Sequence, residues 1–221
     1  MRLMLALAFA LVGPSPQAKD NMPPEGFTAL FNGKDLTNWQ GLVEYPKRDK
    51  DPDKYAAQIK AANEKYLPHW KVEDGALHYT GKGQSLQTVK DYADFELFVD
   101  WKIKAGGDSG IYLRGQPQVQ IWDPGKTAQN AVGSGGLFNN QKNPSKPSKC
   151  ADKPIGQWNT FRIVMKGEKV NIWLNGELVV DNVTLENYWD RKSTVPATGP
   201  IELQHHGDEL WFKNIYVKEL K

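Results

Sequence analysis

The stretch Asp94–Asp123 constrains the fold most, because its apolar side chains recur at every second position. Over residues 95–104 the odd positions are apolar and the even positions are charged, with Phe98 as the exception. Residues 111–114 and 118–122 repeat the alternation over shorter runs. A period of two is typical of strands that place one face on a core. The stretch therefore predicts three strands that share one apolar face.

The opposite faces of the second and third strands carry polar and aromatic side chains together. If the aliphatic residues face the core, one outer surface is lined by Tyr112, Arg114, Gln118, Gln120 and Trp122. Amide and guanidinium groups can hydrogen-bond sugar hydroxyls, and an aromatic ring offers a flat apolar surface to a pyranose. We therefore expect these residues to bind carbohydrate. The alternative is an ordinary solvated sheet face.

The charge balance argues against a nucleic-acid ligand. The 221 residues include 28 basic and 26 acidic side chains, for a formal net charge of +2. No block of Lys or Arg is interleaved with aromatic residues, which is the pattern that nucleic-acid binding favours. The single cysteine, Cys150, excludes an internal disulfide framework and is expected to be an incidental thiol.

The N-terminus has the pattern of a secretory signal peptide. Met1 and Arg2 give a positive start, residues 3–12 are apolar, and Gly13–Pro16 would break a helix before the small residue Ala18. Ten apolar residues are too few to cross a bilayer. We therefore expect a leader at 1–18, a periplasmic or secreted protein, and no membrane span.

One segment has the period of a helix. Asp51 and Pro52 are typical of an N-cap and a first helical position. Residues 55, 59, 62 and 66 are apolar or aromatic and fall on one helical face. We expect a helical insertion at about 52–66, on the rim of a single domain that spans 19–221.

Most of the remaining chain reads as short strands separated by turns. The clearest hairpin is residues 170–181, with Asn175-Gly176 at its turn. The segment 130–155 is rich in Gly, Asn, Lys and Pro, and loops of this length are usually functional. About a dozen short strands with one helix predict an all-β sandwich or jelly roll.

A further polar run is expected on the same outer surface. In residues 201–206 the aliphatic positions 201 and 203 would face the core, which leaves Glu202, Gln204 and His206 on the polar side. A histidine titrates near neutral pH, so His206 is the predicted general base. His205 has the other parity and is expected to be structural.

Other chemistries find little support. No Glu-x-Asp-x-x-Glu strand supplies the paired carboxylates of a retaining glucanase. Gly-Asp-Ser-Gly at 107–110 is not the nucleophile elbow of a serine hydrolase, and the histidines at 69, 78, 205 and 206 are not spaced for zinc. No cofactor is expected; an oxygen-rich calcium site using Asp108 or Asp123 is the alternative.

Several motifs occur in a fixed order: NGKDLTNW at 32–39, WKVEDGAL at 70–77, DFEL at 94–97, GDSGIYLRG at 107–115, PQVQIWD at 117–123, WNTFRI at 158–163, LNGELVVDN at 174–182 and IELQHHG at 201–207. Together they resemble the 3-keto-disaccharide hydrolase family over essentially the whole chain after the leader. The chain departs from the commoner family pattern at Val119-Gln120, where that pattern has a Glu-x-Gln pair. The resemblance implies a concanavalin A-like jelly roll, an exported bacterial protein, and cleavage of glycosides already oxidised at C3.

The implied reaction needs no pair of carboxylates. A C3 ketone acidifies the C2 proton, so a base removes it, the C1 substituent leaves, and water adds across the double bond. The expected roles are base for His206, enolate stabiliser for Arg114 with Gln120 or Gln204, proton donor for Glu202 or Asp123, and sugar-stacking ring for Trp122 or Trp158.

Two other classes of function are alternatives. A non-catalytic carbohydrate-binding module would use the same aromatic and amide side chains, and a structural jelly roll in an envelope assembly would use neither. Only His206 separates the enzyme from the binding module, because a binding module gains little from a titratable group at that position.

Overall fold

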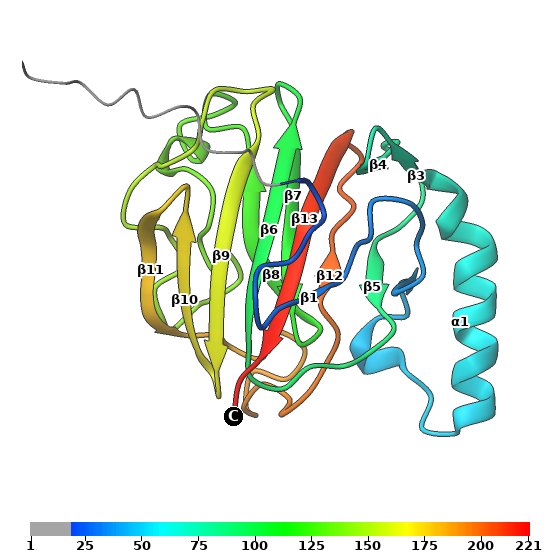
Figure 1. Ribbon diagram of the computed structural model, residues 1–221. Helices are drawn as coiled ribbons and strands as arrows, with labels where there is room; N and C mark the ends of the chain where they lie inside the picture. The colour runs from blue at the N-terminus through cyan, green and yellow to red at the C-terminus, as the bar shows by residue number, and fades with distance from the viewer. Residues whose placement is uncertain (1–18) are drawn as a thin grey trace, which may run out of the picture.

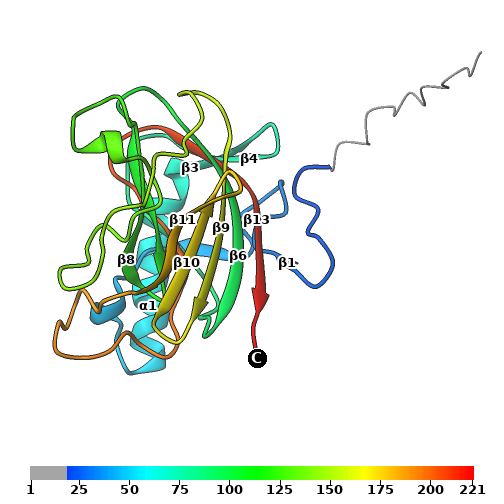
Figure 2. The ribbon, with the colours of Figure 1, turned by 90° about the vertical axis from the view of Figure 1, so that its left-hand side faces the viewer.

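The computed structural model describes residues 19–221, so the expected signal peptide lies outside the described residues. Two antiparallel sheets pack face to face, with one in front of the other in Figure 1 and the two seen edge-on in Figure 2. The predicted all-β sandwich is therefore confirmed. No helix within 19–221 is both long and apolar enough to cross a membrane.

Sheet A follows the order β11 (Glu177–Thr184), β10 (Lys169–Leu174), β9 (Asn159–Lys166), β6 (Phe95–Ile103), β13 (Leu210–Glu219), β4 (Ala76–Tyr79) and β3 (Trp70–Glu73), with β1 (Thr28–Ala29) also paired to β13. Sheet B follows the order β2 (Trp39–Gly41), β5 (Leu86–Thr88), β12 (Glu202–Leu203), β7 (Asp108–Leu113) and β8 (Gln116–Trp122).

The core lies between the sheets and matches the alternation of the sequence. In β6 every odd-numbered side chain is buried and every even-numbered one is half-buried. Phe98, which breaks the polar pattern, lies on the outer side of sheet A and contacts Phe27 edge-to-face, with ring centroids 5.4 Å apart. A second aromatic ring thus explains the exception.

The predicted hairpin is β10–β11. Asn175 has φ of 53° and Gly176 has φ of 87°, and positive φ at both central residues is the geometry of a type I′ turn. That turn matches the twist of the flanking strands, so it fixes the register of this edge of sheet A.

Helix α1 (Pro52–Tyr66) begins where the Asp51 side chain accepts the N–H of Asp53, at 3.0 Å. It packs beside β2, at the edge of sheet B (Figure 1). A Cβ at Gly41 would meet the Ala62 carbonyl oxygen at 2.5 Å, so only glycine allows this approach. Within residues 19–221, three short 3-10 turns complete the helical segments: η1 (Tyr45–Lys47), η2 (Leu67–His69) and η3 (Asn130–Val132).

The long segment predicted to be functional extends sheet B beyond β8. Leu137 forms an isolated bridge with Val119, and Gln120 exchanges backbone hydrogen bonds with Gly135 and Gly136. Figure 2 shows this segment and the 185–200 loop gathered on the side of the sandwich that β8 forms. Sheet B is thus the face around which the loops are arranged.

Candidate active site

The outer face of sheet B, here called the polar face, is lined by Gln40, Gln87, Asp108, Tyr112, Gln116, Gln118, Gln120, Glu202 and Gln204. Strand register places several of these side chains directly opposite one another on neighbouring strands. Gln40 pairs with Gln87, and Glu202 pairs with both Gln87 and Tyr112. The predicted substrate-binding residues Tyr112, Gln118, Gln120 and Gln204 and the predicted proton donor Glu202 therefore share one face, as the alternation requires.

His206 lies at one end of the polar face beside a carboxylate. Its Nδ1 is 4.0 Å from Asp108 Oδ2, and about half of its side chain is exposed. Asp108 Oδ1 accepts a hydrogen bond of 2.8 Å from Gln120 Nε2, and Gln120 Oε1 accepts one of 2.6 Å from Gln118. This series of side chains holds Asp108 in place beside the imidazole.

Gln204, like Gln116, is a polar group of this face with a buried atom left open to a ligand. Its Nε2 donates to the Tyr112 hydroxyl at 3.3 Å, while its buried Oε1 has no partner among the described residues. Leaving a buried acceptor unpaired costs about 1–3 kcal/mol, which a ligand hydroxyl would recover. Gly110 makes room for this amide, because a Cβ there would lie 3.0 Å from Gln204 Oε1.

Glu202 is a buried carboxyl group at the centre of the polar face. Desolvation raises the pKa of Glu202 to about 8, although the nearby Ser85 hydroxyl opposes the shift. The negative charge of Glu44 raises this pKa further and the positive charge of Arg48 lowers it. Glu202 is therefore protonated at neutral pH and able to donate a hydrogen bond.

Ser85 connects Glu202 to His205. Ser85 Oγ lies 3.1 Å from His205 Nδ1 and accepts the His205 backbone N–H at 3.1 Å. Burial, and then the charge of His206, lowers the pKa of His205. The expectation that His205 points away from the polar face is wrong, because its ring lies 3.1 Å from Ser85 Oγ and Ser85 also hydrogen-bonds Glu202 of that face.

The segment before α1 covers the Glu202 end of the polar face. Arg48 makes two hydrogen bonds to Asp91, at 3.0 and 2.8 Å, and a third to Gln87 Oε1 at 3.3 Å. Its guanidinium also lies over the rings of Tyr45 and Tyr55. The upward shift in the pKa of Glu202 comes from the burial of Glu202 itself, which is 4% exposed, because the charge of Arg48 lowers this pKa.

Arg114 does not lie on the polar face, so its predicted position beside Gln120 is wrong. Strand β7 ends at Leu113, and Arg114 has φ of 53°, which turns the chain and reverses the side-chain direction. The buried guanidinium pairs with Asp94 at 2.5 Å and donates to the carbonyl oxygens of Ala93, Gly167 and Pro196. Arg114 links these loops by hydrogen bonds. Its position does not support the expected role as stabiliser of the enolate.

Two other predicted residues also lie elsewhere. Asp123 follows the end of β8, and its carboxylate accepts the N–H groups of Gly106 and Gly125 at 2.7 and 2.8 Å, so it stabilises a turn. Trp158 lies against Lys102 and Lys213, which belong to the outer side of sheet A. Neither is placed to donate a proton to, or stack on, a ligand of the polar face.

Trp122 lies on the polar side of β8 but is itself covered. Its indole N–H donates to the Gly133 carbonyl at 2.8 Å, and Phe138 packs on it edge-to-face at 5.7 Å. Phe138, on the long loop, is 41% exposed. A cavity of about 100 Å³ lies between these rings, Gln120 and Lys146. At this cavity the ring accessible to a sugar is thus Phe138, which sequence alternation could not identify.

The structure assembles no metal site within residues 19–221: no three His, Cys, Asp or Glu side chains converge there. The two candidate calcium ligands, Asp108 and Asp123, are engaged by an amide N–H and by backbone N–H groups respectively. Asp108 has the parity of Tyr112 in β7, which is the signal that could have placed it beside His206.

The chain matches a known family and a named relative. The family described as the 3-keto-alpha-glucoside-1,2-lyase-like domain matches residues 26–218. A 3-keto-disaccharide hydrolase of Bacteroides thetaiotaomicron is 24% identical, over 89% of this chain and 79% of the relative.

Solved structures from Parabacteroides distasonis share the fold. One, described as a proposed glycosyl hydrolase, is 26% identical with a TM-score of 0.66, and the match covers 92% of this chain and all of the other. A second is 24% identical with a TM-score of 0.66, over 96% of this chain and 94% of the other.

Proposed function

Because the chain belongs to the 3-keto-alpha-glucoside-1,2-lyase-like family, we propose that it cleaves glycosides oxidised at C3, by removal of the C2 proton, elimination and hydration. It is a hydrolase, and the name of the Bacteroides relative supports the same substrate class. The route through C2 is an inference from the residues of the polar face.

The two histidines of the polar face carry the proposal. His206 Nδ1 lies 4.0 Å from Asp108 Oδ2, and His205 Nδ1 lies 3.1 Å from Ser85 Oγ. An elimination needs one base and one proton donor, and these two imidazoles can supply them.

His206 is the base of the proposed reaction. Its Nδ1 faces Asp108, which leaves Nε2 free to take the C2 proton. The electrons of the C–H bond pass into an enolate with the C3 carbonyl. Asp108 stabilises the imidazolium that forms, which favours proton transfer.

His205 is the proton donor, and Glu202 replaces its proton through Ser85. A neutral Glu202 donates to Ser85 Oγ and the Ser85 hydroxyl donates to His205 Nδ1, so the other nitrogen, Nε2, carries a proton. That proton goes to the leaving oxygen as the C1–O bond breaks and the C1–C2 double bond forms. One proton then moves from Ser85 to His205 Nδ1 and another from Glu202 to Ser85, which leaves Glu202 as the carboxylate. Water then adds at C1, C2 is reprotonated, and the net change is hydrolysis.

Tyr112 takes the role of enolate stabiliser that was expected of Arg114. Burial, and then the charge of Glu202, raises the pKa of Tyr112, so its hydroxyl stays protonated. That hydroxyl accepts from Gln204, which leaves its own proton for the enolate oxygen. A donor fixed in place before the charge develops is worth about 2.7–4 kcal/mol of barrier in known oxyanion holes.

The experiment compares two substrates that differ only at C3. Purified protein is incubated with p-nitrophenyl 3-keto-glucoside and with the unoxidised parent, in both anomers, and nitrophenol release is followed against a protein-free blank. Release from the keto substrate alone is expected. Equal release from both would contradict the route through C2, and binding of sugar without release would favour a carbohydrate-binding module.

Export to the periplasm or medium, from the leader at 1–18, is also proposed.

A further inference from the structure

Exposed aromatic rings gather beside sheet B. Among the large apolar side chains that are more than one-third exposed in residues 19–221, the aromatic ones are Phe138, Tyr188 and Trp189. Phe138 flanks the cavity near Gln120, whereas Tyr188 and Trp189 stand together on the loop after β11, with ring centroids 4.8 Å apart. Rings with one apolar face in water and a polar atom at the edge are suited to stacking on a sugar.

The loop that carries Tyr188 and Trp189 is fixed to the β7–β8 turn. The Tyr188 N–H donates to Gln116 Oε1 at 2.8 Å, and the Trp189 indole N–H donates to the Gly115 carbonyl at 2.8 Å. Within the loop, Asn187 Oδ1 accepts the N–H groups of Trp189 and Asp190. The rings are therefore held in place before any ligand arrives, which lowers the entropic cost of binding.

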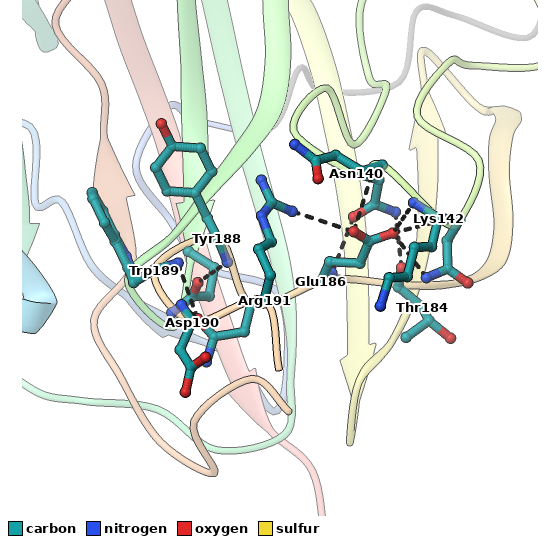
Figure 3. A network of polar contacts seen from close by, with 12 residues as sticks. Asn140, Lys142, Thr184, Glu186, Tyr188, Trp189, Asp190 and Arg191 are labelled. Carbon is teal, nitrogen blue, oxygen red and sulfur yellow. Dashed lines mark hydrogen bonds and ion pairs between the residues drawn. The ribbon is translucent and has the colours of Figure 1, made fainter. Parts of the chain in front are cut away.

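Glu186 ties this loop to the one that follows Phe138 (Figure 3). Its carboxylate accepts the backbone N–H groups of Gln141, Lys142 and Asn143 at 2.7–3.0 Å and pairs with Arg191 at 3.2 Å. Burial raises the pKa of Glu186, but these N–H groups outweigh burial and lower the pKa to about 2. Arg191 is also stacked over the Tyr188 ring, with its guanidinium carbon 5.0 Å from the ring centroid.

The two aromatic groups are separated along β8. Gln116, under Tyr188, and Gln120, beside Phe138, are four residues apart, or about 13 Å. In register Tyr112 lies between them, because Gly110 pairs with Gln120 and Leu113 pairs with Gln116. A ligand whose reacting ring lies near Gln120 would need a further ring to reach Trp189.

We infer that Tyr188, Trp189 and Arg191 form a second sugar-binding subsite, which takes a distal ring of an extended 3-keto-glycoside, with Glu186 as its positioning residue. The inference rests on the proposed function for the identity of the reacting ring. The two aromatic rings supply the stacking surface, and the Arg191 guanidinium supplies N–H donors for hydroxyls.

The test compares ligands of different length. Trp189→Ala and Glu186→Gln are assayed with 3-keto-glucosides that carry a nitrophenyl, a glucosyl or a maltotriosyl or cellotriosyl leaving group. Both variants should lower kcat/KM about tenfold more for the longest substrate than for the nitrophenyl one. Trp173→Ala is the matched control, because Arg162 stacks on Trp173 in the same way on sheet A. It should leave the length dependence unchanged.

A second measurement separates this inference from the proposed function. Titration calorimetry with unoxidised maltotetraose and cellotetraose should show binding that Trp189→Ala weakens and Trp173→Ala preserves. If the nitrophenyl substrate is cleaved but the Trp189 variant matches the parent in both length dependence and binding, the subsite is refuted and the proposed function stands. If no keto substrate is cleaved but binding still depends on Trp189, the proposed function fails and the subsite stands.

Discussion

Replacing Glu202 by Gln should change how the stability of the protein depends on pH. Glutamine keeps the size and the hydrogen-bonding capacity of a protonated carboxyl group but cannot lose a proton. The pKa of Glu202 is raised to about 8 by burial, from an ordinary value of 4.5. Between these values the folded wild type holds a proton that the unfolded chain releases.

The number of protons bound by each state decides whether the free energy of unfolding rises or falls with pH. Because the folded state binds more protons than the unfolded state between pH 4.5 and 8, the free energy of unfolding falls as pH rises through this range. Each pH unit costs about 1.4 kcal/mol, or about 5 kcal/mol over the whole window. Above pH 8 both states are ionised and the difference is constant. Glu202→Gln removes this loss, so it should become progressively more stable than the wild type.

Urea unfolding followed by tryptophan fluorescence, at pH values from 5 to 9, measures this difference. The variant should gain about 4 kcal/mol on the wild type between pH 5 and pH 8 and then keep that margin. Glu186→Gln supplies a control of opposite sign, because the pKa of Glu186 is lowered to about 2. It should be less stable than the wild type at neutral pH. Parallel profiles for Glu202→Gln and the wild type would refute a protonated, buried Glu202.

Three other substitutions test the assigned roles. His206→Ala should lower kcat on the nitrophenyl 3-keto-glucoside by about 10²–10⁴-fold with an unchanged melting temperature, and a smaller loss would remove it as the base. Ser85→Ala breaks the link to His205, so kcat should fall most for the poorest leaving groups; a uniform loss across leaving groups of different pKa would contradict the donor chain. Arg114→Lys should cost about 3 kcal/mol in urea unfolding while the folded enzyme keeps its kcat, because it breaks a buried pair outside the site.

The period-two pattern predicted the polar face as far as the strands extend. Tyr112, Gln118, Gln120 and Gln204 share that face because each lies in, or directly after, a strand whose aliphatic residues are buried. Buried aliphatic residues fix the register of a strand, and register decides the direction of every other side chain. The part of the site that is built on sheet B was therefore predictable.

Beyond the end of a strand, alternation no longer decides the direction of a side chain. Arg114 follows β7 with a positive φ and turns into the loops, and His205 lies beyond β12 and reaches Ser85. Nothing in the sequence pattern marks where pairing stops. The positions of Phe138 and Trp189 depend on loop contacts between distant residues, such as those of Glu186, which local periodicity does not encode.

The fate of the C2 hydrogen tests the central claim most directly. The keto substrate is cleaved in D₂O and the released 3-keto-glucose is examined by NMR. As the control for spontaneous exchange, authentic 3-keto-glucose is incubated in D₂O with the His206→Ala variant. Removal of the C2 proton followed by hydration predicts deuterium at C2 in the enzymatic product well above that control. Product that keeps its original hydrogen at C2 would show direct displacement at C1 and contradict the account.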